Sequence, residues 1–243
     1  MWIGTREEPY GTSHQTDIIP DVDVRHYRNG VSMGLYGLGT PLDWVFAPYA
    51  HQPSAARLQA FEAELRKKFY PDYLEPKRLK ELVRDNASRE ALRAAYDLTW
   101  SDHNLVSMAL YAGPSTSFGW SGSCISGHSV GFGPFEPEGP AGWMSTGDMH
   151  LGVRARRDAF SRHYGQLLRQ VNVFVVPHHG SARNFHASIL GEVPDATQFV
   201  AAAGPNGYGH PNRGLIGCIR SARRDFVQVS EDLASTLQWH LWR

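Results

Sequence analysis

Hydrophobic and polar residues in the second half of the chain follow two alternating patterns. Near-continuous apolar runs at Val173–Val176 and Gln198–Ala203 are typical of strands that are covered on both faces. A short strand is predicted at Gly142–Thr146. Residues 155–171, between it and the two apolar runs, carry apolar side chains at helical spacing and are predicted to form a helix. Strands that alternate with helices in this way predict an α/β fold.

The first half of the chain predicts a hairpin, a short strand and then helices. The Asn29-Gly30 pair between apolar runs at Val22–Tyr27 and Val31–Leu35 is a strong signal for a two-residue hairpin turn. Leu42–Ala47 is predicted to form a short buried strand, and Ser54 to cap the first helix.

The expected elements divide the chain into three segments. Ser88 is expected to cap a later helix of the first half, and residues 113–142, rich in Gly, Ser and Pro, are expected to form one long loop. Phe226–Val229 and Thr236–Trp242 are predicted to close the chain as strands. The segments are an N-terminal hairpin and strand segment (1–53), a charged helical insertion or lid (54–96) and a C-terminal α/β half (97–243).

The composition excludes several classes of protein but does not indicate a particular function. The chain has 243 residues and a formal net charge of zero, which excludes a strongly basic nucleic-acid coat or an acidic disordered tail. Its two cysteines form no Cys-x-x-Cys pair, so a structural zinc ribbon or a disulfide scaffold is not expected. No apolar run approaches the ~18 residues of a membrane span, and we expect a cytoplasmic protein without a membrane segment.

Three polar motifs follow predicted strands, and strand ends are where α/β sheets bind ligands. Asp148 stands behind a glycine that allows a tight turn, which is a suitable position for a metal ligand. His178 and His179 lie between a proline and a glycine, and histidine is both the commonest metal ligand and the usual acid–base group near neutral pH. His210 precedes a predicted helix, where a phosphate group binds well. Together the motifs predict a site: Ser145-Thr146-Gly147-Asp148, Val176-Pro177-His178-His179-Gly180-Ser181 and Asn206-Gly207-Tyr208-Gly209-His210-Pro211.

The order of these motifs resembles that of metallo-β-lactamase-fold hydrolases, above all the nuclease-like domain of ComEC-type DNA-uptake proteins. The stretch from Asn104 to Leu110 also resembles a strand of that family, and the likeness covers about residues 100–230. The resemblance implies a partial or truncated αββα sandwich that carries a helical insertion. It also implies a hydrolase of nucleic acid or another phosphodiester that uses a divalent metal, zinc in the first place and manganese as the other candidate.

The resemblance assigns roles to individual residues. Asp148 matches the aspartate that ligates and usually bridges the metals, and His179 matches a late histidine ligand. His178 and His210 inherit catalytic roles beside the metal or the substrate. The expected substrate-binding residues come from the same motifs: Ser181, Asn206 and Tyr208.

One part of the family pattern is missing. The main metal-binding signature, His-x-His-x-Asp-His, does not occur, and the nearest string, Ser13-His14-Gln15-Thr16-Asp17-Ile18, keeps one histidine and one aspartate. Because three or four protein groups normally hold each zinc ion, Asp148 and His179 need further ligands. Three readings follow. The chain is a hydrolase completed by a partner chain or upstream residues, a degenerate member that binds or scaffolds, or an unrelated α/β domain.

Overall fold

The computed structural model describes most of the chain, and the described residues form two compact units. It describes residues 2–5, 33–37, 40–71, 76–100, 107–115, 119–126, 139–205 and 207–242. One unit contains the described residues up to Ala50 and from Ser107 onward, and the other contains those between His51 and Trp100. No helix among the described residues is long and apolar enough to cross a membrane.

An eight-stranded mixed sheet is the centre of the first unit, in the order β1-β2-β3-β4-β6-β7-β8-β9. Neighbouring strands are antiparallel from β1 to β6 and parallel from β6 to β9. This mixed sheet with its helices confirms the α/β class. The strands are β1 (Trp2–Thr5), β2 (Met33–Gly37), β3 (Thr40–Ala50), β4 (Met108–Pro114), β6 (Gly142–Ser145), β7 (Val171–Val175), β8 (Gln198–Ala202) and β9 (Phe226–Val229).

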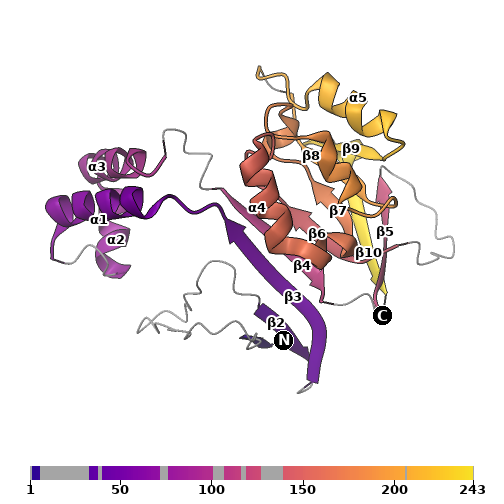
Figure 1. Cartoon of the computed structure of the whole chain (residues 1–243), viewed down its shortest axis with the longest axis horizontal. Helices are drawn as coiled ribbons and strands as arrows, with labels where there is room; N and C mark the ends of the chain where they lie inside the picture. The colour runs from indigo at the N-terminus through magenta and orange to yellow at the C-terminus, as the bar shows by residue number, and fades with distance from the viewer. Residues whose placement is uncertain are drawn as a thin grey trace. The chain divides into compact units, whose positions relative to one another are not determined.

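The two central parallel strands, β7 and β8, are mostly buried, and helical connections cover one face of the sheet. Phe174 of β7 and Phe199 of β8 are fully buried with ring centroids 5.4 Å apart, and Phe160 of α4 belongs to the same core. Figure 1 shows α4 across one face of the sheet, in front of β4, β6 and β7. The connections are α4 (Arg154–Tyr164), the 3-10 turns η2 (Gly165–Gln170), η3 (His178–Gly180) and η4 (Ala187–Gly191), and α5 (Arg213–Ser221).

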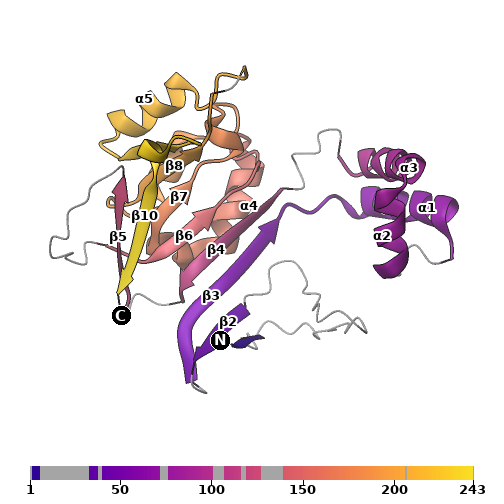
Figure 2. The ribbon, with the colours of Figure 1, turned by 180° about the vertical axis from the view of Figure 1, so that it is seen from behind.

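A two-stranded ribbon lies against the other face of the sheet. It pairs β5 (Ser121–Ser126) with β10 (Leu237–Trp242) in antiparallel register, and Figure 2 shows it in front of the sheet, opposite α4. Its Trp239 ring lies 6.1 Å from Trp44 on β3 and 5.6 Å from Trp143 on β6, measured between centroids. Tryptophan side chains therefore fill the space between ribbon and sheet.

Cys124 of β5 is half-buried and faces the large sheet. Its Sγ donates a hydrogen bond to Asn172 Oδ1 at 3.2 Å, and burial raises the pKa of the thiol to about 12. The thiol therefore stays protonated at neutral pH, which makes it a poor nucleophile.

The structure corrects two sequence expectations and leaves a third untested. The long loop expected at 113–142 contains β5, whose Gly- and Ser-rich sequence carries no strand signal. The helix expected over 155–171 ends at Tyr164, because Gly165 takes a positive φ of 47° and the chain continues as a 3-10 turn. The expected strand Val22–Tyr27 lies outside the described residues.

The second unit is helical, with α1 (Ala55–Phe69), α2 (Pro76–Arg84) and α3 (Asn86–Asp97). Ser54 caps α1 as expected, accepting from Arg57 N–H at 3.4 Å. The cap of α3 is Asp85, which accepts from the N–H of Ser88 at 2.8 Å, so Ser88 lies inside that helix and the expected cap at Ser88 is wrong. Leu65 and Ala95 are its buried apolar centre.

Removing the helical unit is expected to leave the first unit folded. Ala50 at the end of β3 pairs with Met108 at the start of β4, so a short glycine–serine linker in place of residues 51–106 joins two neighbouring strands. Urea unfolding followed by circular dichroism should show one cooperative transition. A shortened chain with no transition would instead make residues 51–106 part of one folding unit with the sheet.

Candidate functional site

Three loops meet at the carboxyl edge of the parallel strands. They follow β6, β7 and β8, and parallel neighbours present their carboxyl ends on the same edge. The N–H of His178 donates to the carbonyl of Gly147 at 2.8 Å, and the N–H of Asn212 donates to the carbonyl of Gly180 at 2.9 Å. These bonds join the loop after β7 to the other two, so the structure brings the three motifs together.

The loop after β7 has an unusual backbone. His178, His179 and Gly180 are consecutive residues in the left-handed region, with φ of 50°, 55° and 88°. Such angles are uncommon outside glycine, and each costs roughly 1–3 kcal/mol unless its surroundings enforce it. Here Ser181 N–H donates to the carbonyl of His178 at 3.0 Å and closes the turn. Strained backbone of this kind concentrates at functional sites.

Gly180→Ala is expected to disturb the site without altering a polar side chain. A Cβ on Gly180 would lie 2.7 Å from Cβ of Pro211, the neighbour of His210, and the positive φ adds strain. We expect the free energy of unfolding to fall by about 1–3 kcal/mol in urea titrations.

Gly191→Ala is the matched control, because a Cβ there meets no atom within 4 Å. Equal losses of stability in the two variants would show that the approach of Gly180 to Pro211 is not what matters.

Three imidazole rings gather at this edge. The ring centroid of His178 lies 5.5 Å from that of His210 and 6.2 Å from that of His179. Burial, together with the nearby His178 and His179, lowers the pKa of His210, so its ring is neutral at pH 7. Nδ1 of His178 is buried and has no hydrogen-bond partner within the described part of the chain.

His179 is fixed in one tautomer. Its Nδ1 lies 2.6 Å from the carbonyl oxygen of Ala202 at the end of β8. A carbonyl oxygen only accepts, so Nδ1 carries the proton and Nε2 keeps a free lone pair in the neutral ring. Metal-ligating histidines typically donate their other ring N–H in this way. His179 is therefore prepared to bind an electrophile or to accept a proton through Nε2.

The Asp148 turn is held from two sides. Its N–H donates to Ser107 Oγ at 2.7 Å, and its carbonyl accepts from Asn184 Nδ2 at 3.2 Å. Gly147 has a φ of 49°, and a Cβ there would lie 2.9 Å from the carbonyl oxygen of Met108. The sequence did not point to Asn184 as a site residue. The only hint in the sequence is a polar amide next to the apolar Phe185.

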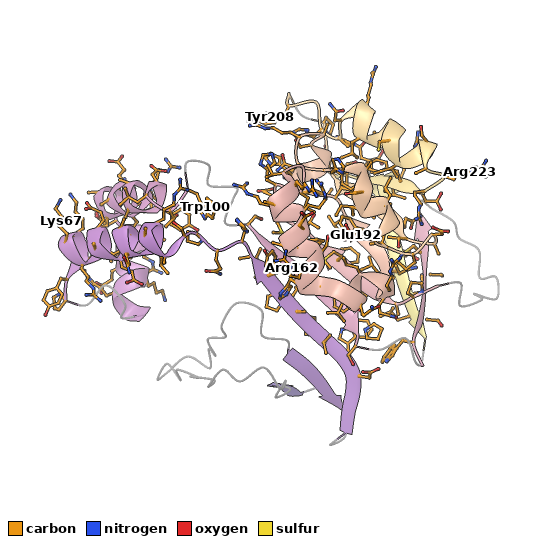
Figure 3. All side chains as sticks on the ribbon, viewed as in Figure 1. Lys67, Trp100, Arg162, Glu192, Tyr208 and Arg223 are labelled. Atoms are coloured by element: carbon orange, nitrogen blue, oxygen red, sulfur yellow. The ribbon has the colours of Figure 1, made fainter. Side chains whose placement is uncertain are left out.

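The expected substrate-binding residues lie in different surroundings. Ser181 is only 8% exposed and directly follows the histidine turn. Tyr208 is 86% exposed, and Figure 3 shows it on the loop after β8 with its side chain pointing away from the sheet. Asn206 lies outside the described residues.

Positive charge flanks the site at the start of α4. Arg156 Nη1 donates to His150 Nδ1 at 3.3 Å, and exposed Arg154 pairs with Asp158 at 3.6 Å. Arg157 is buried and donates to the carbonyls of Leu151 and Gly152, so it holds the loop that leads into the helix. Asp158 offsets the charge of Arg154, and Arg156 adds positive charge beside His150.

The described residues do not complete a metal centre. Among them, no three His, Cys, Asp or Glu side chains lie close enough together to hold one ion. Asp148 and His179 would supply two ligands, whereas catalytic zinc sites usually have three from the protein. The string from Ser13 to Ile18 lies outside the described residues, so its contribution is a prediction from sequence alone.

No family model, curated protein or solved structure matches this chain. The resemblance to metallo-β-lactamase-fold hydrolases therefore rests on the sequence motifs and their order alone.

Proposed function

We propose that the chain is a metal-dependent hydrolase of the metallo-β-lactamase superfamily that acts on phosphodiesters, nucleic acid among them. Further ligands, from a partner chain or from residues outside the described ones, complete its metal centre of zinc or manganese. The observation that carries this proposal is the gathering of His178, His179 and His210 at a carboxyl edge, with Nε2 of His179 left free by the bond to Ala202.

The proposed architecture is a partial αββα sandwich. Support comes from the face-to-face packing of the ribbon on the large sheet, with α4 outside the sheet on the other face. The common edge of the three site loops, which follow β6, β7 and β8, adds support for the proposal.

The chain's own residues supply orientation and proton transfer. Asp148 presents a carboxylate on a turn that cannot shift freely, and His179 presents Nε2 in a fixed tautomer. His210, neutral at pH 7, accepts a proton from the attacking water or, once protonated, donates one to the leaving oxygen. His178 packs against His210 and keeps that ring in place.

Metal analysis and hydrolysis assays on one preparation test the proposal. The purified protein should contain a divalent metal and hydrolyse bis(p-nitrophenyl) phosphate or single-stranded DNA, with its partner chain present if it has one. Full activity in excess chelator would overturn the metal dependence.

The second candidate is a degenerate subunit that binds or scaffolds. It is favoured by the lack of three converging ligand side chains in the described part of the chain. Protein that is free of metal and inactive in every complex would decide for this candidate. Metal-dependent turnover would decide for the hydrolase.

His210→Ala is expected to lower kcat by roughly 10²–10⁴-fold, the range for loss of a general acid or base, with a smaller effect on KM. Because His210 has a lowered pKa, its neutral form persists below the usual histidine range. Wild-type activity that uses His210 as a base should therefore fall only at a pH below that range, and this acid limb should vanish in the variant.

His186→Ala is the matched control, because that exposed histidine bonds to Ser188 outside the cluster. An unchanged kcat in His210→Ala would remove the residue from the mechanism.

A further inference from the structure

Two polar side chains outside the proposed catalytic set hold both ends of the Asp148 peptide. Ser107 Oγ, immediately before β4, accepts from Asp148 N–H at 2.7 Å. Asn184, which follows the histidine turn, donates from Nδ2 to the carbonyls of Asp148 and Met149, each at 3.2 Å. Asn184 is 8% exposed, so its side-chain amide donates to these two carbonyls rather than to water.

Asn184 also belongs to the histidine loop. Its N–H donates to the carbonyl of Ser181 at 3.1 Å, and Ser181 N–H donates to the carbonyl of His178 at 3.0 Å. The N–H of His178 then donates to the carbonyl of Gly147, the residue before Asp148. These bonds form a closed ring that joins the carboxylate turn to the histidine turn.

Close backbone approaches leave this ring little freedom. A Cβ on Gly147 would collide with the Ser107 hydroxyl, and a Cβ on Gly152 would collide with the carbonyl oxygen of Arg183. The loop after β6 is thus packed closely against Arg183 of the loop after β7 and against Ser107, which precedes β4. A shift of the amide would move Asp148 relative to His178 and His179.

We propose that Asn184 and Ser107 are positioning residues that fix the Asp148 carboxylate relative to the histidine turn. This inference rests on the proposed function, in which Asp148 and His179 act together. Catalytic groups need placement to within about 0.5 Å, and partners that orient such groups are typically worth ~10–100-fold in activity. The alternative is that Asn184 merely satisfies two buried carbonyls, as most buried amides do.

Asn184→Ala and Ser107→Ala test the proposal against a matched control, Asn172→Ala. Asn172 is a buried asparagine of β7, 4% exposed, which accepts from Cys124 beneath the ribbon and away from the three loops. For each full-length variant we would measure kcat and KM on bis(p-nitrophenyl) phosphate, and the ring ¹⁵N–¹H resonances of the histidines by NMR.

The two site variants should each lower kcat by ~10–100-fold with a smaller change in KM, and should shift the ring resonances of His178 and His179. Asn172→Ala should lose stability but keep both the kcat and the resonances of the wild type. Folded site variants with unchanged resonances, or an Asn172 variant that shifts them equally, would overturn the proposal.

The two readouts separate this proposal from the proposed function. If the wild type hydrolyses no phosphodiester, the proposed function fails, while the NMR comparison still decides whether Asn184 and Ser107 place the histidine turn. If Asn184→Ala does not fold, the half-buried Ser107 decides the question, because it contacts the same peptide from the other side.

Discussion

Asp148→Ala is expected to abolish hydrolysis and to remove bound metal in the same step. In the proposed centre the Asp148 carboxylate would hold the metal together with His179, and the resemblance gives it the bridging role, so its loss would leave this chain too few ligands to retain the metal. The effect should exceed the ~10–100-fold typical of residues that only orient a ligand. Metal content and kcat/KM should be measured on one preparation, and His179→Ala should lose mainly one ion.

Asp158→Ala is the control for this substitution. Asp158 lies on α4, is half exposed and pairs with Arg154, so its removal changes the charge nearby without touching the three loops. The assignment of Asp148 would be wrong if Asp148→Ala kept its metal and its activity while Asp158→Ala lost them.

Trp239→Ala is expected to lower the free energy of unfolding by about 3–5 kcal/mol, the usual cost of truncating a large packed aromatic residue. Trp239 of the ribbon packs against Trp44 and Trp143 of the sheet. Urea unfolding followed by circular dichroism measures the loss, and Trp239→Phe should recover part of it because a ring still fills the space.

Labelling of Cys124 shows whether the ribbon itself detaches. Its thiol is half-buried between the ribbon and the sheet with a pKa of about 12, so it should react slowly with thiol reagents while the ribbon is docked. In a Cys218→Ser background, Cys124 should react much faster in Trp239→Ala than in the parent. Unchanged labelling alongside the stability loss would mean that the substitution weakens the sheet as a whole.

The parallel strands could be predicted from sequence because their signal is local. Val173–Val176 is apolar without interruption, and a strand buried on both faces requires that pattern. The structure places β7 and β8 within one or two residues of the predicted runs. β5 could not be predicted, since its sequence, Ser-Gly-Ser-Cys-Ile-Ser, becomes a strand only through pairing with β10.

The position of the site could be predicted from the sequence, but its detailed geometry could not. Motifs at the ends of parallel strands must share one edge, so the meeting of the loops with Asp148, His178 and His210 follows from topology. The left-handed φ of His178 and His179 does not follow from topology, and neither do the hydrogen bonds of Asn184. Both depend on how the loops pack against one another. The roles of these residues remain predictions that the variants above test.

The pairing of β5 with β10 has a consequence for synthesis on the ribosome. The parallel strands β6 to β9 are all translated after β5 and before β10. β5 therefore has no strand to pair with until β10 has been synthesised. During that interval Trp44 and Trp143 lack the cover that Trp239 provides in the finished fold. Exposed aromatic surface and an unpaired strand are the features that lead nascent chains to aggregate or to bind chaperones. The yield of folded protein should therefore depend on the rate at which the last strand emerges as well as on the stability of the final structure.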